Sequence, residues 1–149
     1  MSSAVRSFSK VDSKGRALQL PLLGLGTGCC LPLAVRRAIA LGYRLFDTAS
    51  LYGNHAWLGD AILASIASGV RREDFVVCTK LSVEQLQSAD AIERAVQQAL
   101  SALRLDYIDV VSLHSPLDKQ GLPVDFAAVF RSARLASVLC SRAVMQATC

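Results

Sequence analysis

The sequence predicts an α/β fold in which parallel strands alternate with helices. Three short apolar runs each end at a polar residue, and they occupy residues 43–47, 75–80 and 107–114. Segments with apolar residues at helical spacing separate these runs, and this alternation implies parallel strands joined by right-handed crossovers. Chemistry in such folds takes place at the carboxyl ends of the strands. We therefore expect Asp47, Lys80 and His114 to gather at one end of the sheet.

The composition fits one globular domain: 149 residues, 52% hydrophobic and 19% charged, can bury a sizeable core. The net charge of +4 is scattered along the chain, which indicates a solvated surface and no nucleic-acid partner. Five cysteines without a CxxC pair, and only two histidines, predict reduced thiols and no metal site. Since no apolar run approaches the roughly 18 residues of a membrane helix, and no signal-peptide core is present, we expect a cytoplasmic protein without membrane contact.

The N-terminal part predicts a hairpin and a glycine-rich turn. Residues 8–20 alternate loosely around a turn signal at 13–16, and the apolar run 22–25 is a short strand. It leads into Gly26, Thr27 and Gly28, where the backbone can approach a ligand closely. These glycines, with an acid about 20 residues on, also imitate a Rossmann fingerprint. A Rossmann-type NAD-binding module is the weaker alternative, because Cys29 replaces the third glycine and Pro32 interrupts the expected helix start.

Helical periodicity predicts three helices. Residues 33–41 form the first, ending before Gly42, and residues 55–67 form the second, ending at Gly69. Ser88 caps the third. The predicted buried stripes are Val35, Ala38 and Ile39; Leu58, Ala61, Ile62, Ser65 and Ile66; and Ile92, Val96, Ala99, Leu100 and Leu103. Because side chains alternate along a strand, each predicted strand has three residues on one of its sides: Tyr43, Leu45 and Asp47 in the first, Val76, Cys78 and Lys80 in the second, and Val110, Ser112 and His114 in the third. His55, in the first turn of its helix, is predicted to be a surface or pocket-rim residue.

Several motifs occur in a familiar order: Gly24-Leu25-Gly26-Thr27; Gly42-Tyr43-Arg44 through Asp47-Thr48-Ala49 to Tyr52-Gly53-Asn54; Thr79-Lys80; and Leu105-Asp106-Tyr107-Ile108-Asp109 to His114-Ser115-Pro116. In these motifs the sequence resembles the aldo-keto reductase family from about residue 20 to residue 116. The resemblance implies an incomplete (β/α)8 TIM barrel of about four βα units preceded by the N-terminal hairpin. Residues 1–117 would be the N-terminal half of the barrel, and 118–149 a divergent tail, irregular or partly helical, without a convincing fifth strand.

The resemblance also implies an NADP(H)-dependent oxidoreductase that reduces aldehydes or ketones to alcohols by hydride transfer. Its catalytic tetrad would be Asp47, Tyr52, Lys80 and His114, and its cofactor neighbours would be Gly26, Thr27 and Asp47. A free phenol is a poor acid at neutral pH, and a nearby ammonium makes it stronger by stabilising the phenolate. That role falls to Lys80 acting on Tyr52. Asp47 would keep the Lys80 ammonium charged and orient it, and His114 would orient the carbonyl group of the substrate. The substrate would be a small-molecule carbonyl compound or alcohol.

A whole barrel typically takes about 250 residues, so we expect the sequence to be a truncated, misread or alternatively processed product. An open half-barrel would expose strand edges and self-associate through them. The alternative function is therefore a non-catalytic binding or assembly fragment of the same fold. Because the cofactor contacts that the family draws from its second half have no counterpart, we expect weak NADPH binding by the isolated chain.

Overall fold

The structure is a computed structural model that describes residues 7–11, 17–118, 120–125 and 144–146. Its centre is a five-stranded parallel sheet, in which each strand pairs with the next one along the chain. The strands are β3 (Gly24–Gly26), β4 (Leu45–Asp47), β5 (Val76–Leu81), β6 (Val110–Leu113) and β7 (Val144–Gln146). Before them, β1 (Ser7–Val11) and β2 (Ala17–Pro21) pair antiparallel, which confirms the predicted hairpin; its turn at 12–16 lies outside the described residues.

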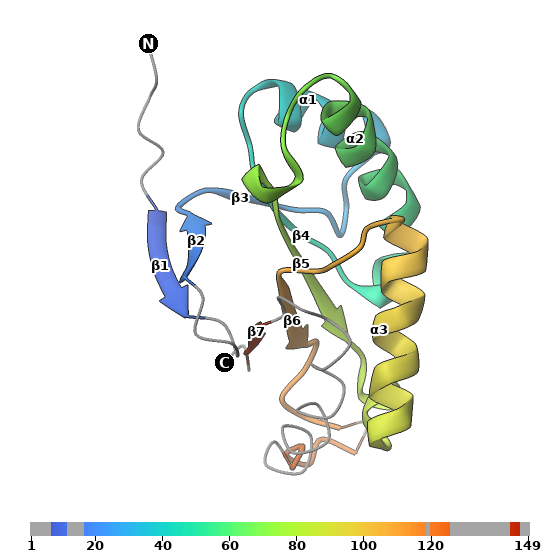
Figure 1. Cartoon of the computed structure of the whole chain (residues 1–149). Helices are drawn as coiled ribbons and strands as arrows, with labels where there is room; N and C mark the ends of the chain where they lie inside the picture. Colours follow the sequence, from blue (N-terminus) through green and yellow to red (C-terminus); the bar gives the residue numbers. More distant parts are fainter. Residues whose placement is uncertain (1–6, 12–16, 119, 126–143, 147–149) are drawn as a thin grey trace.

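Three helices follow the first three strands of the sheet: α1 (Pro32–Ala40), α2 (His55–Ala67) and α3 (Ala89–Leu103). Figure 1 shows them together along one side of the sheet. A consecutive strand order with a single layer of helices is the arrangement of an open segment of a (β/α)8 barrel. The doubly wound Rossmann fold instead reverses its strand order in mid-sheet. The order of the described strands therefore opposes the Rossmann alternative.

A continuous apolar core fills the space between the sheet and the helices. Phe46 of β4, Val77 of β5 and Val111 of β6 are buried in it, together with side chains from all three helices. In β4 the neighbours of Phe46 are only half-buried, so the predicted alternation of inward and outward positions is confirmed there. Phe75, just before β5, packs against Phe46 with ring centroids 6.3 Å apart. This packing fixes the strands relative to one another and therefore fixes where their carboxyl ends lie.

The helix boundaries follow the sequence signals closely. Helix α2 has the predicted bounds, and α1 begins one residue earlier than predicted, at Pro32, where a proline loses no helical hydrogen bond. The Ser88 hydroxyl accepts a hydrogen bond from the Ala91 N–H at 3.1 Å, so the predicted cap of α3 is confirmed. After α1 the chain turns at Gly42, whose φ of 94° suits glycine. The most deeply buried predicted stripe is that of α3, from Ile92 to Leu103.

A buried ion pair joins the amino ends of β5 and β6, opposite the predicted site. Arg72 donates to the Asp109 carboxylate at 2.9 Å and to the Tyr107 carbonyl at 2.8 Å, and its guanidinium lies 3.8 Å from the Tyr107 ring centroid. Asp109 also accepts the Val77 N–H at 3.0 Å. The two charged side chains are only 13% and 4% exposed. Although most of the charged residues that the structure describes are exposed, as expected of a solvated surface, this pair is part of the interior.

The prediction that no fifth strand follows residue 117 is wrong, because β7 pairs in parallel with β6 from Val110↔Val144 to Ser112↔Gln146. Three residues carry too little periodicity to predict a strand, and pairing along the edge of β6 creates it. The rest of the tail at 126–143 and 147–149 lies outside the described residues. At the other edge, β3 pairs only with β4 in the part of the chain described, and self-association there stays a prediction.

Candidate active site

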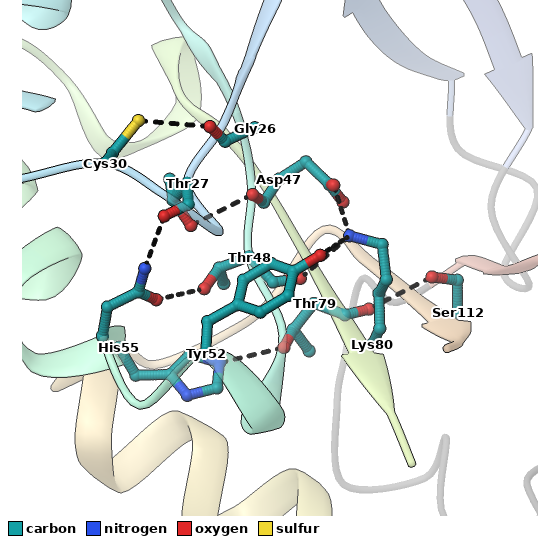
Figure 2. Close-up of polar contacts among 11 residues, drawn as sticks. Gly26, Thr27, Cys30, Asp47, Thr48, Tyr52, His55, Thr79, Lys80 and Ser112 are labelled. Carbon is teal, nitrogen blue, oxygen red and sulfur yellow. Dashed lines mark hydrogen bonds and ion pairs between the residues drawn. The ribbon is translucent and has the colours of Figure 1, made fainter. Parts of the chain in front are cut away.

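Three of the four predicted catalytic side chains meet at the carboxyl ends of β4 and β5. Lys80 donates to the Asp47 carboxylate in an ion pair, and its Nζ lies 3.5 Å from the Tyr52 hydroxyl. A third contact, to the Thr48 carbonyl at 3.3 Å, holds the same ammonium. Figure 2 shows the lysine side chain reaching from β5 toward Asp47 and the phenol. The register of the sheet brings these side chains close together, since it pairs Asp47 with Cys78, two residues before Lys80.

His114 completes the group from the end of β6. Its ring stands edge-on to the Tyr52 ring, with centroids 5.7 Å apart and planes at 78°. The backbone N–H donates to the Leu81 carbonyl at 2.8 Å, which fixes the residue beside β5. The ring atom Nδ1 is buried and has no hydrogen-bond partner among the described residues. Buried polar atoms normally have a partner, and a catalytic role or a bound water or ion is among the explanations for one that has none.

The surroundings of the Lys80 ammonium are polar but partly closed to water. The lysine side chain is 15% exposed, whereas its partner Asp47 is 42% exposed, so the carboxylate faces the open side of the site. Cys78, which pairs with Asp47 across β4 and β5, is a different case. Burial, together with the nearby Asp47 and Asp109 carboxylates, raises the pKa of its thiol to about 12 against the opposing effect of Lys80. This thiol is therefore protonated and is no nucleophile at neutral pH.

The turn after β3 carries two of the predicted cofactor neighbours, and they differ in access. Thr27 is 1% exposed, and its N–H and hydroxyl both donate to the Asp47 carbonyl, at 2.8 and 3.1 Å. Its own carbonyl accepts from Asn54, so all of its polar groups have protein partners. Gly26, in contrast, is exposed, and apart from its chain neighbours no described residue comes within 4 Å of where its Cβ would stand. A ligand could therefore approach the backbone at Gly26, while Thr27 shapes the turn.

The prediction that His55 is a surface or rim residue is wrong. It is 7% exposed, and its Nε2 lies 2.9 Å from the Thr79 hydroxyl; burial lowers the pKa of its imidazole. His55 stands three residues before Leu58 and seven before Ile62, at the spacing of the buried stripe of α2. That spacing was the signal available in the sequence. The imidazole faces the core because the stripe begins in the first turn of the helix.

Sequence reasoning also missed a buried hydrogen-bonded group behind Tyr52. Asn54 donates to the Thr27 carbonyl at 2.7 Å and accepts from the Thr48 hydroxyl at 2.8 Å. All three of these residues are almost fully buried. No periodic pattern marks them, because they belong to turns whose partners lie 6 and 27 residues away.

Three features bear on other kinds of site. Within the described ranges, no three His, Cys, Asp or Glu side chains come together as a metal site. Of the described cysteines, Cys29, Cys30 and Cys78 are free thiols. No helix in the same ranges is long and apolar enough to cross a bilayer.

Comparison with known proteins gives this geometry a family context. The sequence model of the aldo/keto reductase family matches residues 33–123, which extends the resemblance past residue 116. An aldo-keto reductase of Mycobacterium sp. (strain MCS) is 39% identical over 110 residues, covering 71% of this chain and 38% of that protein. An NAD(P)H-dependent D-xylose reductase of Kluyveromyces lactis is 38% identical over 113 residues, covering 72% of this chain and 34% of that protein.

Solved structures agree with the sequence comparison. The crystal structure of a Bombyx mori aldo-keto reductase in complex with NADP matches with a TM-score of 0.74 and 29% identity, covering 95% of this chain and 51% of that one. A second aldo-keto reductase, complexed with NADPH, matches with a TM-score of 0.75 and 26% identity, covering 95% and 48%. The chain thus spans about half the length of these structures. Because the family model matches more than half of its residues, the chain belongs to the aldo/keto reductase family.

Proposed function

We propose that this chain supplies the acid–base part of an NADP(H)-dependent oxidoreductase that reduces aldehydes or ketones to alcohols. The observation that carries the proposal is the position of the Lys80 ammonium, which contacts both the Asp47 carboxylate and the Tyr52 hydroxyl. Relatives described as NAD(P)H-dependent, or solved with NADP, support the choice of cofactor. A small carbonyl compound or its alcohol is the corresponding substrate.

In this proposal Tyr52 is the general acid that gives its phenolic proton to the carbonyl oxygen. The phenolate left behind is stabilised by the Lys80 ammonium, 3.5 Å away. Asp47 holds and directs that ammonium, since the ion pair fixes Nζ between carboxylate and phenol. His114, whose ring borders the phenol, would orient the substrate carbonyl through a hydrogen bond.

NADP(H), when bound, supplies the hydride that the carbonyl carbon receives. The residues proposed to lie beside it are Gly26, Thr27 and Asp47. The open space in front of Gly26 and the exposed carboxylate of Asp47 suit such a neighbour. Thr27 would act indirectly, because its polar atoms already bind protein groups and hold the end of β4 in place.

A chimera tests the proposal without requiring that the 149 residues be active alone. Residues 24–123 would replace the matching segment of the Bombyx mori relative, and NADPH oxidation would be followed with a generic aldehyde. We expect Tyr52→Phe to lower kcat by about 10²- to 10⁴-fold, the usual contribution of general acid catalysis. Tyr43→Phe is the matched control, since Tyr43 lies before β4, at the opposite end of that strand. Undiminished turnover in the Tyr52 variant would remove the phenol from the mechanism.

A further inference from the structure

We propose that Asn54 is a positioning residue for Tyr52: its buried amide holds the turn after β3 as a wall against the phenol ring. The inference rests on the proposed function, because it concerns how the general acid is held. Asn54 does not touch the Lys80 ammonium or the phenolic oxygen in any described contact, and it would act through the backbone of Thr27 and Gly28.

The amide of Asn54 makes two directed hydrogen bonds in a water-poor environment. Its Nδ2 donates to the Thr27 carbonyl at 2.7 Å, and its Oδ1 accepts from the Thr48 hydroxyl at 2.8 Å. The carbonyl of Thr27 can only accept, so the NH₂ group must face it, and this sets the orientation of the whole amide. Asn54 is 4% exposed, and its partners Thr27 and Thr48 are 1% and 0% exposed. Loss of either bond leaves a buried polar group unpaired.

These bonds fix the backbone that touches the catalytic ring. Thr27 is held at its N–H and hydroxyl by the Asp47 carbonyl, and its own carbonyl accepts from Asn54 and from the Cys30 N–H, at 2.7 and 3.0 Å. The next residue, Gly28, lies so close to the phenol that a Cβ there would stand 3.2 Å from Cζ of Tyr52, the carbon that bears the hydroxyl. Because Gly28 has no side chain, its backbone can lie directly against the Tyr52 ring. The position of Gly28 therefore limits where the phenolic oxygen can stand.

The turn that carries Tyr52 gives the ring little support of its own. Tyr52 ends a three-residue 3-10 turn, Ser50–Tyr52, in which Leu51 is 63% exposed. The ring is bounded instead by Gly28, by the Lys80 ammonium 5.2 Å from its centroid and by the edge of His114. The hydroxyl stands 3.5 Å from Nζ, at the outer limit of a hydrogen bond. A small movement of the Gly28 backbone away from the ring is therefore enough to separate the Tyr52 hydroxyl from the Lys80 ammonium.

The test is a tyrosine-ring NMR spectrum of the 149-residue chain. The sequence has three tyrosines, so ring ¹³C labelling gives three sets of signals, which Tyr52→Phe assigns by removal. Thr48→Val removes the hydroxyl that binds Asn54 and keeps the shape of the side chain. Thr48→Ser is the matched variant that keeps the hydroxyl. Asn54→Asp is a second perturbation, which removes the donor to Thr27 and keeps an acceptor for Thr48.

We expect Thr48→Val and Asn54→Asp to shift or broaden the Tyr52 signals while those of Tyr43 and Tyr107 keep their wild-type positions, and Thr48→Ser to restore the wild-type spectrum. Wild-type Tyr52 signals in both disruptive variants would overturn the inference. Equal changes in all three tyrosines would also overturn it, since they would indicate a purely global effect. The spectrum requires no turnover, so an inactive wild-type chimera would count against the proposed function and leave this result standing.

Discussion

Helix α2 meets the end of α3 at Gly59. This contact predicts that Gly59→Ala lowers the stability of the fold, whereas helix propensity alone would raise it. A Cβ at Gly59 would stand 2.1 Å from the Leu103 carbonyl oxygen and 2.7 Å from its carbon. Real Cβ atoms essentially never come within 3.0 Å of a heavy atom, so Gly59→Ala requires the two helices to separate by about 1 Å. The obstacle is backbone in a helix, which cannot turn aside as a flexible side chain can.

Two opposing effects set the magnitude. Overpacking in a well-packed interior costs about 1–3 kcal/mol, and the backbone obstacle places Gly59→Ala near 3. Alanine is a better helix former than glycine by about 1 kcal/mol in a helix interior. We therefore expect a net loss of about 2 kcal/mol in the free energy of unfolding, or a fall in Tm of about 8 °C at about 4 °C per kcal/mol.

Urea unfolding followed by circular dichroism measures this change. Ala64→Gly, at an exposed position of the same helix, is the control, and we expect it to cost about 1 kcal/mol through helix propensity alone. If close packing at Gly59 were unimportant, Gly59→Ala would raise the stability by about the amount that Ala64→Gly lowers it. An increase in the free energy of unfolding for Gly59→Ala would therefore refute the reasoning.

Three further predictions follow from other contacts. Stability is expected to fall as the pH drops below about 6.5, and His55→Gln to flatten this fall in pH-dependent melts. Arg72→Met is expected to cost about 3–5 kcal/mol in urea unfolding, because it removes the guanidinium that pairs with the buried Asp109 carboxylate, which is 4% exposed. The isolated 149-residue chain is expected to bind NADPH weakly and to show negligible turnover, because a tetrad without a positioned hydride donor has little to accelerate. Quenching of the single tryptophan, Trp57, reports that binding.

Each of these three predictions would be contradicted by a different result. Burial holds the pKa of His55 below its usual 6.5, so between these two values the unfolded chain binds a proton that the folded chain does not. The contribution of His55 to stability is thus fully present above about pH 6.5, and it is lost as the pH falls toward the pKa of the folded state. An unchanged dependence of stability on pH in His55→Gln would contradict this. For Arg72→Met, adding Asp109→Leu should recover stability, and no recovery would oppose the explanation by loss of the buried ion pair. Micromolar NADPH binding, with turnover abolished by Lys80→Met, would contradict the third prediction.

The local sequence determined the elements and the end of the sheet at which the polar residues stand. The stripe from Ile92 to Leu103 and the Ser88 cap predict α3 because helical spacing and capping are properties of neighbouring residues. Asp47, Lys80 and His114 lie close together because parallel strands joined by crossovers all end on the same side. A polar residue at the end of each apolar run was therefore enough to place these three residues together.

Contacts between distant segments were decided only in the folded chain. The approach of Lys80 to Tyr52 depends on the register that pairs Asp47 with Cys78, and strand alternation alone does not fix a register. The amide of Asn54 binds a carbonyl 27 residues away, and Arg72 pairs with a carboxylate 37 residues away. Such pairs follow no period along the chain. They form because buried polar groups must find partners, and the packing of β3, β4, β5 and β6 determines which partners are within reach.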